Sequence, residues 1–184
     1  MAAFGVGSMQ GGGVTGGQPM SSQGPSEGDF ILVYFLEHQA VGKEFARTRD
    51  TWPLHITLVT WFVAPAARQL VADLDAIIPG LRPFEAVLGK EEQFAEDTRV
   101  TLVKNQADVQ RLHDTLAECV QTAAGEIRDK RWIGDRYTAH VTHHASEKPP
   151  RKGTRLDVTE FSLVRLLPGD TCGVARNFHL GVER

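Results

Sequence analysis

The chain has 184 residues, 41% of them hydrophobic, which predicts one globular domain with a core large enough to fold alone. Its formal net charge of −3 argues against a protein that grips long duplex nucleic acid, because such proteins need a basic surface. The sequence shows no apolar run near the roughly 20 residues of a membrane span and no signal peptide, so we expect a cytoplasmic protein.

The first 28 residues are rich in Gly, Ser and Gln, and they show no apolar periodicity. A segment of this kind buries too little apolar surface to offset the entropy that it loses on ordering. We therefore predict a disordered tail over residues 1–28 and a folded domain over residues 29–184.

The secondary structure of the domain is predicted from its apolar pattern. Apolar and β-branched runs or alternations indicate strands, and apolar residues that recur every three or four positions indicate helices. In chain order we predict strands over residues 30–36 and 55–63, a helix from Pro65 to Pro79, strands over 84–94 and 98–104, a helix from Asn105 to Gly125, and strands over 139–144, 155–167 and 174–182.

The two halves of this order are alike, because each contains a helix and a strand that carries a His-x-Thr motif. This repetition predicts a duplicated α+β unit, with two lobes whose sheets face a shared cleft. The motifs are His55-Ile56-Thr57 and His140-Val141-Thr142.

The paired motifs predict a reaction. Residues i and i+2 of a strand point the same way, so each motif presents an imidazole beside a hydroxyl. One neutral imidazole can take a proton from an attacking hydroxyl or water, and the other can give a proton to the leaving oxygen. The threonine hydroxyls can hold the non-bridging phosphate oxygens. This is acid–base phosphoryl transfer that needs no metal or other cofactor.

The segments WPLHITLVTWF and RYTAHVTHHA resemble the two signature segments of the 2H phosphoesterase superfamily. That superfamily includes RNA 2',3'-cyclic phosphodiesterases and bacterial 2'-5' RNA ligase-like proteins. The similarity covers residues 30–182. It implies a bilobal α+β fold with pseudo-twofold symmetry, in which antiparallel sheets face a central cleft and the helices pack outside. It also implies acid and base roles for His55 and His140, without saying which is which, and phosphate binding by the hydroxyls of Thr57 and Thr142.

The second signature segment departs from the family pattern on both sides of the motif. Ala139 stands where proline is common, and His143 and His144 stand where apolar or small residues are usual. By strand parity, His144 would face the cleft beside Thr142 and could contact phosphate or substrate. A solvated strand end is the alternative for this residue.

Other side chains near the second motif are candidates for substrate binding. Arg136 and Tyr137 lie just before His140, where a cation and an aromatic ring could bind phosphate and stack a base. Trp132 could act in the same way. Ordinary loop and core packing is the alternative for all three.

Near the first motif, Arg47 and Arg49 lie in the loop that leads to His55, where they could form a cationic lid over the cleft. The alternative is a pair of solvated loop arginines. Trp61 continues the face of His55, as part of either the cleft floor or the core.

The remaining histidines and cysteines receive structural predictions. His113 lies off the apolar stripe of its helix and is predicted to be on the surface, and neither His38 nor His179 belongs to a pattern. Cys119 lies on that stripe, so we expect a buried thiol. Cys172 is the second of the two cysteines in the sequence, and so small a number favours a reducing compartment.

The sequence leaves three classes of function open. The leading one is an enzyme that acts, as a monomer, on a small nucleotide or an RNA end: a 2',3'-cyclic phosphate, a cyclic nucleotide, a 2'-5' linkage or a cyclic oligonucleotide. The second is a metal-dependent hydrolase that uses the cluster of His140, His143 and His144, with Glu147 nearby, although the spacing is poor for ligation. The third is a non-catalytic nucleotide- or RNA-binding module on the same fold.

Overall fold

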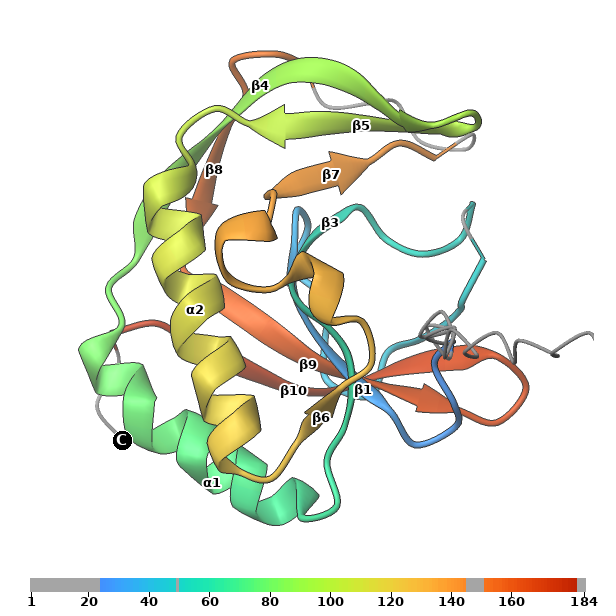
Figure 1. Ribbon diagram of the computed structural model, residues 1–184, viewed down its shortest axis with the longest axis vertical. Helices are drawn as coiled ribbons and strands as arrows, with labels where there is room; N and C mark the ends of the chain where they lie inside the picture. The colour runs from blue at the N-terminus through green and yellow to red at the C-terminus, as the bar shows by residue number, and fades with distance from the viewer. Residues whose placement is uncertain (1–23, 49, 145–150, 182–184) are drawn as a thin grey trace, which may run out of the picture.

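The computed structural model describes residues 24–48, 50–144 and 151–181, which fold into a curved sheet with helices against it (Figure 1). The sequence pattern explains the two long helices, since each carries buried residues at helical spacing. The elements are β1 (Phe30–Phe35), β2 (Glu44–Ala46), β3 (His55–Val63), α1 (Ala67–Ile77), η1 (Ile78–Gly80), β4 (Phe84–Ala95), β5 (Thr98–Val103), α2 (Gln106–Thr122), β6 (Glu126–Ile127), η2 (Lys130–Trp132), η3 (Gly134–Arg136), β7 (His140–Thr142), β8 (Arg155–Val158), β9 (Glu160–Leu167) and β10 (Thr171–His179).

The sheet has the strand order β2-β10-β9-β1-β3-β7-β5-β4-β8, and β6 pairs with β3 outside this path. Among the described residues, every strand pair is antiparallel. When the short edge strand β2 is set apart, three strands lie on each side of the β3–β7 pair: β10, β9 and β1 on one side, and β5, β4 and β8 on the other. The molecule therefore has two similar lobes that join at β3 and β7, and the predicted bilobal α+β fold is confirmed.

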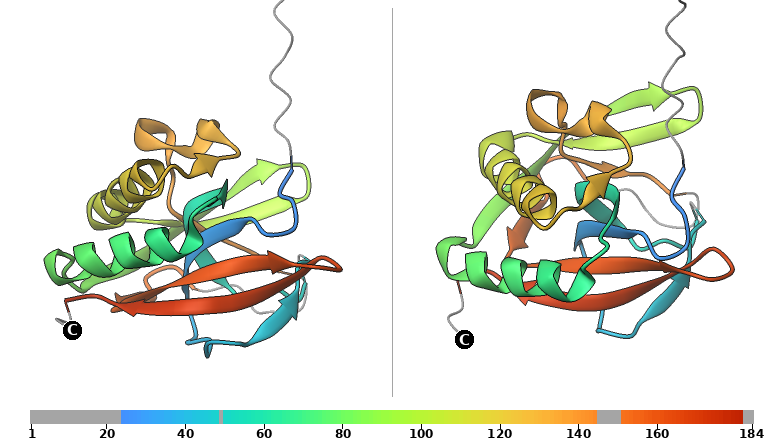
Figure 2. Two further views of the ribbon diagram at one scale, coloured as in Figure 1. Left: turned by 90° about the horizontal axis from the view of Figure 1, so that it is seen from below. Right: turned by 60° about the horizontal axis from the view of Figure 1, so that its bottom comes forward.

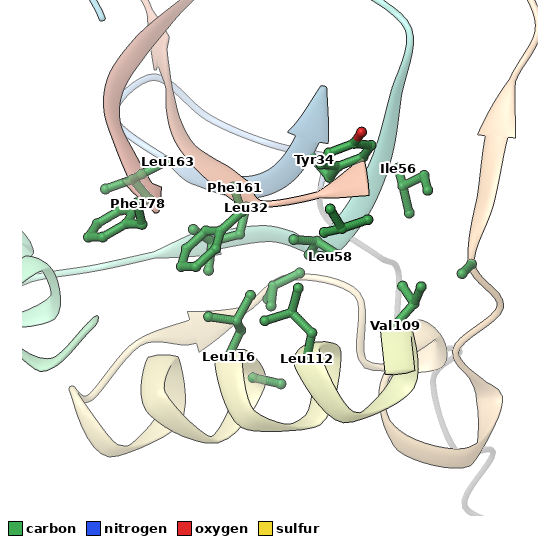
Figure 3. Close-up of a cluster of buried hydrophobic side chains, with 14 of the residues drawn as sticks. Leu32, Tyr34, Ile56, Leu58, Val109, Leu112, Leu116, Phe161, Leu163 and Phe178 are labelled. Carbon is green, nitrogen blue, oxygen red and sulfur yellow. The ribbon is translucent and has the colours of Figure 1, made fainter. Parts of the chain in front are cut away.

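Both long helices lie side by side on one side of the sheet, as the views over β9 and β10 show (Figure 2). Their apolar faces pack against β1 and β3 in the main core. Leu112 and Leu116 of α2 point toward Leu32 and Leu58, which are nearly inaccessible to solvent (Figure 3). Burial of such a leucine stabilises the fold by about 1.5–3 kcal/mol.

The opposite face of the first lobe carries a second apolar cluster. It is built on Val33 and Phe35 of β1, and Trp52 and Trp61 pack against it. In the β1–β3 ladder, Phe35 lies opposite His55. Since opposite residues of a strand pair share a face, this cluster lies on the side of the sheet that carries the first His-x-Thr motif.

The C-terminal strands differ from the prediction in one respect that matters for the architecture. The predicted strand over 155–167 is two strands that separate at Thr159. The first, β8, pairs with β4 in one lobe, and the second, β9, pairs with β1 and β10 in the other. The chain thus crosses between the lobes within what reads as a continuous apolar run. The short strands β2 and β6 were not predicted, because neither lies in a longer apolar or alternating run of the sequence.

The start of the folded chain is held by a buried ion pair. Asp29 is 3% exposed and accepts two hydrogen bonds from Arg128, at 2.9 and 3.0 Å. The backbone N–H of Gly28 also donates to the carbonyl of Leu166, at 2.8 Å. Most of the predicted tail, residues 1–23, lies outside the described residues, and the boundary at 29 stays a prediction. In the part of the chain that the structure describes, no helix has the length and apolar character needed to cross a membrane.

Candidate active site

The two His-x-Thr motifs meet at the seam between the lobes. In the β3–β7 pair, Ile56 lies opposite Val141, and these are the central residues of the two motifs. Both are buried, at 1% and 0% exposure. Because side chains alternate along a strand, the histidine and threonine of each motif project from the other face of the sheet.

The antiparallel register then fixes which side chains are neighbours. His55 lies across from Thr142, and Thr57 lies across from His140. Opposite Cβ atoms in such a pair are about 4.5–5.5 Å apart, and diagonal neighbours are about 7–8 Å apart. The two imidazoles occupy one diagonal and the two hydroxyls the other. All four residues are partly exposed, so they are open to a ligand that enters between them.

Each imidazole is oriented by the same backbone contact. Nδ1 of His55 lies 2.8 Å from the carbonyl oxygen of Pro53, and Nδ1 of His140 lies 2.7 Å from that of Thr138. A carbonyl oxygen can only accept, so Nδ1 carries the hydrogen in both rings. The acceptor lone pair of each neutral ring is therefore on Nε2, the atom available for proton transfer. The contacts are related by the pseudo-twofold axis at the seam.

The surroundings of His55 are aromatic. Its ring stacks on Trp52, with centroids 5.1 Å apart and an interplanar angle of 28°, and it makes an edge contact with Phe35, with centroids 6.2 Å apart. Burial in this environment lowers the pKa of His55 to about 4, with smaller contributions from nearby His144 and His140, while the hydrogen bond to Pro53 opposes the shift. His55 is therefore a neutral proton acceptor at neutral pH.

The surroundings of His140 are more open. Its ring lies 4.8 Å from that of Phe94, and Phe94 is parallel to Trp132, with centroids 6.4 Å apart and an interplanar angle of 5°. Burial lowers the pKa of His140 and the hydrogen bond to Thr138 opposes this effect. The two halves of the site thus share their backbone geometry and differ in the aromatic residues around each imidazole.

A pocket of about 270 Å³ opens beside His140. Its walls come from β3, the end of β4, η2 and the segment before β7. The lining residues are Thr57, Leu58, Thr60, Phe94, Trp132, Tyr137, Thr138 and His140. The pocket is therefore continuous with one histidine and one threonine of the paired motifs.

Tyr137, in the wall of this pocket, and His113, on which it stacks, differ from the predictions. Tyr137 is 8% exposed and stacks on His113 in place of the predicted base, with centroids 3.9 Å apart and an interplanar angle of 6°. Its hydroxyl donates to the carbonyl of Thr57 at 2.9 Å. The prediction that His113 lies on the surface is also wrong. His113 is 1% exposed, and its Nδ1 donates to the Leu58 carbonyl at 2.5 Å. The polar partner explains how a histidine off the apolar stripe is buried.

The other predicted contacts are distributed around the site. Arg47 forms an ion pair of 2.7 Å with Asp170, in the turn between β9 and β10, so this contact replaces the predicted lid. Its companion Arg49 lies outside the described residues. Arg136 is exposed in η3. Trp61 packs edge-on against Trp52, with ring centroids 5.6 Å apart, in the second apolar cluster.

The two extra histidines after the second motif have different environments. The backbone N–H of His143 donates to the carbonyl of Arg99, and its Nε2 lies 2.6 Å from the hydroxyl of Thr101. Since Thr101 pairs with Val141, His143 is on the face opposite to His140. His144 is 8% exposed, and its charge lowers the pKa of His55, which places it near the first motif. His143 is therefore separated from His140, with which the metal-ligand alternative combines it.

The described residues contain no group of three or more His, Cys, Asp and Glu that could hold a metal ion. Glu147, the carboxylate that the same alternative invokes, lies outside them. The cysteines are both free and buried, as predicted for Cys119. Burial raises the pKa of Cys119 to about 11 and that of Cys172 to about 12, so neither is a ready nucleophile.

Sequence reasoning missed two aromatic residues of the site, Trp52 and Phe94. Trp52 lies three residues before His55, in a loop, and nothing in the sequence places its ring on the imidazole. Phe94 is close to His140 only because β4, β5 and β7 are adjacent in the sheet. The one available signal was a bulky aromatic residue at the polar end of a strand.

Comparison with known proteins fixes the family. The model of the 2'-5' RNA ligase superfamily matches residues 36–165. The chain belongs to this superfamily. The resemblance to 2H phosphoesterases is thereby confirmed, and membership in the 2'-5' RNA ligase superfamily supports a phosphodiesterase-type function. Among curated proteins, none matches the chain significantly.

Solved structures support the same fold at low sequence identity. A structure described as a phosphoesterase has a TM-score of 0.56 and 18% identity, and covers 85% of this chain and 100% of its own. TT0787 of Thermus thermophilus has a TM-score of 0.53 and 19% identity, with the same coverage. Escherichia coli LigT, in complex with 3'-AMP, has a TM-score of 0.52 and 18% identity, again with the same coverage. These likenesses show that the chain shares the fold of these three proteins.

Proposed function

We propose that this member of the 2'-5' RNA ligase superfamily is a metal-independent phosphodiesterase. Its substrate is an RNA end or a small nucleotide with a 2',3'-cyclic or 2'-5'-linked phosphodiester. The observation that carries the proposal is the register of the seam, which sets Ile56 opposite Val141 and so brings both motifs onto one face. The catalytic residues are His55, Thr57, His140 and Thr142.

The geometry supports an in-line displacement. A phosphate between the two imidazoles would have one Nε2 on the side of the attacking oxygen and the other on the side of the leaving oxygen. The first accepts the proton of water or a hydroxyl as the new P–O bond forms, and the second donates a proton to the departing oxygen. The hydroxyls of Thr57 and Thr142, on the other diagonal, donate to the non-bridging oxygens, on which charge gathers.

A nucleotide ligand is supported by a structural neighbour and by the pocket. LigT of E. coli was crystallised with 3'-AMP, a nucleoside with phosphate on its ribose ring. Opening a 2',3'-cyclic phosphate yields a ligand of this class. The 270 Å³ pocket next to His140 offers space beside the phosphate for such a nucleoside.

The direct test is turnover of a small panel of substrates in the presence of EDTA. The panel contains 2',3'-cyclic nucleotides, 2'-5' dinucleotides and cyclic oligonucleotides. We expect hydrolysis of at least one class without added metal. Activity that EDTA abolishes and a divalent metal restores would favour a metal-dependent hydrolase. Tight binding without turnover of any phosphodiester would favour a binding module.

Substitution of each histidine tests the mechanism. His55→Ala and His140→Ala should each lower kcat by about 10²–10⁴-fold, the usual contribution of a general acid or base. His179→Ala is the matched control, because His179 is exposed and lies beside Glu160 on β9, 3.2 Å from its carboxylate. A folded His55→Ala or His140→Ala variant that turns over substrate at the wild-type rate would overturn the two-histidine mechanism.

Substitution of each threonine tests phosphate binding. Thr57→Val and Thr142→Val keep the shape of the side chain and remove one donor. Loss of one donor to a developing oxyanion costs about 10²-fold in kcat. We therefore expect losses below those of the histidine variants, with the pH dependence of kcat unchanged. A loss confined to KM would mean that the hydroxyl binds only the ground state.

A further inference from the structure

A second pocket of the molecule is lined by three arginines. It has a volume of about 410 Å³ and lies between α1 and the strands β1, β9 and β10. Arg68 comes from α1, Arg165 from β9 and Arg176 from β10. Among the described residues, no acidic side chain lines it. This arginine pocket therefore gathers positive charge in a chain whose formal net charge is −3.

The arginine pocket is on the helix side of the sheet, where α1 lies over β9 and β10 (Figure 2). Phe30 and Leu163, which line the pocket, belong to the main core beneath the helices. His55 shares the opposite face with Phe35, which belongs to the second apolar cluster. The sheet therefore separates the arginine pocket from the paired motifs, and the two are distinct sites.

An irregularity in β10 turns one of the arginines toward this pocket. Val174 pairs with Val164, and Arg176 pairs with Leu163. Ala175 is therefore an extra residue, as in a β-bulge. In a regular ladder, Ala175 would lie opposite Leu163 and Arg176 would face the other side of the sheet. The bulge thus brings a guanidinium to the helix side and leaves a small side chain beside it.

Two of the three guanidiniums are held by their neighbours. Arg176 donates to both carboxylate oxygens of Asp75, at 2.8 and 2.7 Å, and its guanidinium lies 5.2 Å from the centre of the Phe178 ring. The guanidinium of Arg165 lies 5.9 Å from the centre of the Phe30 ring. Guanidiniums that rest on aromatic faces are positioned before a ligand arrives, so they lose little freedom when it binds.

The positive charge of the pocket is only partly neutralised. Asp75 pairs with Arg176, but in the described part of the chain neither Arg68 nor Arg165 forms an ion pair. Both side chains are exposed. Unpaired positive charges that line one pocket raise the local concentration of anions. The planar fork of a guanidinium matches phosphate, to which it donates two parallel hydrogen bonds.

The floor of the pocket narrows the ligand further, because it is apolar. Phe30 and Leu163 contribute from the strands, and Val71 contributes from α1. An inorganic anion among the guanidiniums would leave these carbon atoms in contact with water. A ligand with a carbon skeleton beside its phosphate would cover them and gain the free energy of burying apolar surface.

A small ligand fits this pocket better than an RNA strand does. Proteins that hold single-stranded nucleic acid combine a basic groove with exposed aromatic rings, on which the bases stack. Among the described residues, the exposed large hydrophobic side chains are Val41, Phe94 and Trp132, and none of them lines the arginine pocket. The ring of Phe30, which does line it, is only 7% exposed.

We infer that the arginine pocket binds a small organic phosphate, a monoester with a compact apolar body. The phosphate, with a charge of about −1.5 to −2 at pH 7, lies among the guanidiniums of Arg68, Arg165 and Arg176. The carbon skeleton lies against Phe30 and Leu163. The inference does not depend on the proposed function, because this site uses no residue of the paired motifs.

The site is tested by titration of the ¹⁵N-labelled protein with phenyl phosphate. The measurement is the change of backbone amide signals, which distinguishes the arginine pocket from the paired motifs. We expect shifts at Ala67, Leu163 and Ala175, with a dissociation constant that rises as NaCl is added. Shifts confined to the residues around the paired motifs would overturn the inference.

Substitution of the unpaired arginines tests their part in binding. Arg68→Gln and Arg165→Gln should each raise the dissociation constant for phenyl phosphate at the pocket about tenfold or more, because each removes a charge-assisted hydrogen bond. Arg155→Gln is the matched control: it makes the same change of charge at an exposed arginine of β8, in the other lobe. Wild-type affinity in both pocket variants, or an equal loss in Arg155→Gln, contradicts the site.

A comparison with inorganic phosphate tests the apolar part of the ligand. Inorganic phosphate should bind the wild-type pocket about tenfold or more weakly than phenyl phosphate, because it covers none of the apolar floor. Ala175→Leu keeps every charge and fills space beside the floor, so it should remove most of this difference. Equal affinity of the wild type for the two phosphates would mean that the ligand is not organic.

A single-stranded RNA of ten nucleotides without terminal phosphates tests the other class of ligand. We expect it to leave the amide signals of the arginine pocket unchanged. If it binds there more tightly than phenyl phosphate, and Arg68→Gln and Arg165→Gln weaken that binding, the pocket holds an RNA strand and the inference of a small ligand is wrong.

Discussion

At the residue scale, the two histidines of the site have the same backbone contact and different neighbours. Each donates from Nδ1 to the carbonyl two residues earlier, at 2.8 and 2.7 Å. His55 is enclosed by Trp52 and Phe35, and His140 lies beside the exposed ring of Phe94. The backbone therefore sets which nitrogen reacts, and the aromatic neighbours decide how readily each ring takes a proton.

The lowered pKa of His55 predicts a dependence of stability on pH. Its pKa falls from 6.5 to about 4 on folding, because burial and the neighbouring His140 and His144 disfavour the charged ring. Between these values the unfolded chain holds a proton that the folded chain does not, so the stability contributed above about pH 6.5 is lost as the pH falls toward about 4. We expect His55→Ala to lose less stability than the wild type over this window.

The measurement is urea unfolding of both proteins at about pH 7 and about pH 4.5. His113 and His143 also have pKa values lowered by burial, but they are present in both proteins and cancel in the comparison. An equal loss of stability in the two proteins would show that His55 titrates normally in the folded state.

The sequence predicted the histidines and threonines of this site better than the aromatic residues around them. Two residues in a strand point the same way whatever surrounds them, so local geometry alone predicted the paired imidazole and hydroxyl of each motif. The stacking of Trp52 on His55 depends on the conformation of the loop before β3, and that of His113 on Tyr137 depends on how separate segments pack. No periodicity reports such contacts. That is why His113 was wrongly placed on the surface.

At the element scale, the segment before β7 is fastened to β3 across the seam. Tyr137 donates to the carbonyl of Thr57 at 2.9 Å, and its ring lies on His113 of α2. Nδ1 of His113 donates to the Leu58 carbonyl, and Nε2 accepts from the N–H of Gly134 at 3.3 Å. A helix, a strand and a loop are therefore linked by two stacked rings behind the catalytic face.

Tyr137→Phe tests this link. The change keeps the ring on His113 and removes one hydrogen bond to the backbone of the first motif. A net loss of about 1 kcal/mol in the free energy of unfolding is expected, since the Thr57 carbonyl loses a buried donor. Chemical denaturation measures it. Thr60→Val is the control, because Thr60 lines the same pocket. An undiminished stability of Tyr137→Phe would mean that water replaces the hydroxyl.

The bounds of helices and strands could be predicted where the apolar pattern is long. The prediction failed where strand pairing sets the end of a strand. The runs that became β1, β3 and the two long helices are periodic over six or more residues, and their bounds agree closely with the prediction. The break at Thr159 is invisible in the sequence, because β8 and β9 have similar apolar content. It exists because the two strands pair with different lobes.

At the scale of the whole molecule, the catalytic site and the joint between the lobes are the same place. The β3–β7 pair connects the two halves of the sheet, and its paired residues, Ile56 and Val141, are the centres of the motifs. The distance between the two imidazoles is therefore set by the packing that holds the lobes together. Proton transfer requires reacting atoms within about 0.5 Å of their places. Packing at the seam should then affect catalysis as well as stability.

Ile56→Ala separates this idea from a general loss of stability. Truncating a fully buried isoleucine costs about 2–5 kcal/mol, and Ile56 is 1% exposed in the main core. Leu74→Ala is the matched control: Leu74 of α1 is equally buried in the same cluster but lies away from the motifs. Both variants should lose similar stability in chemical denaturation.

The two variants should differ in kcat at a temperature where both remain folded. Ile56→Ala should lose about 10-fold or more in kcat, because a small misplacement of catalytic groups slows the reaction strongly. Leu74→Ala should keep the wild-type kcat. Equal kcat values for the two variants would mean that the lobes hold the motifs in register without the packing at their centre.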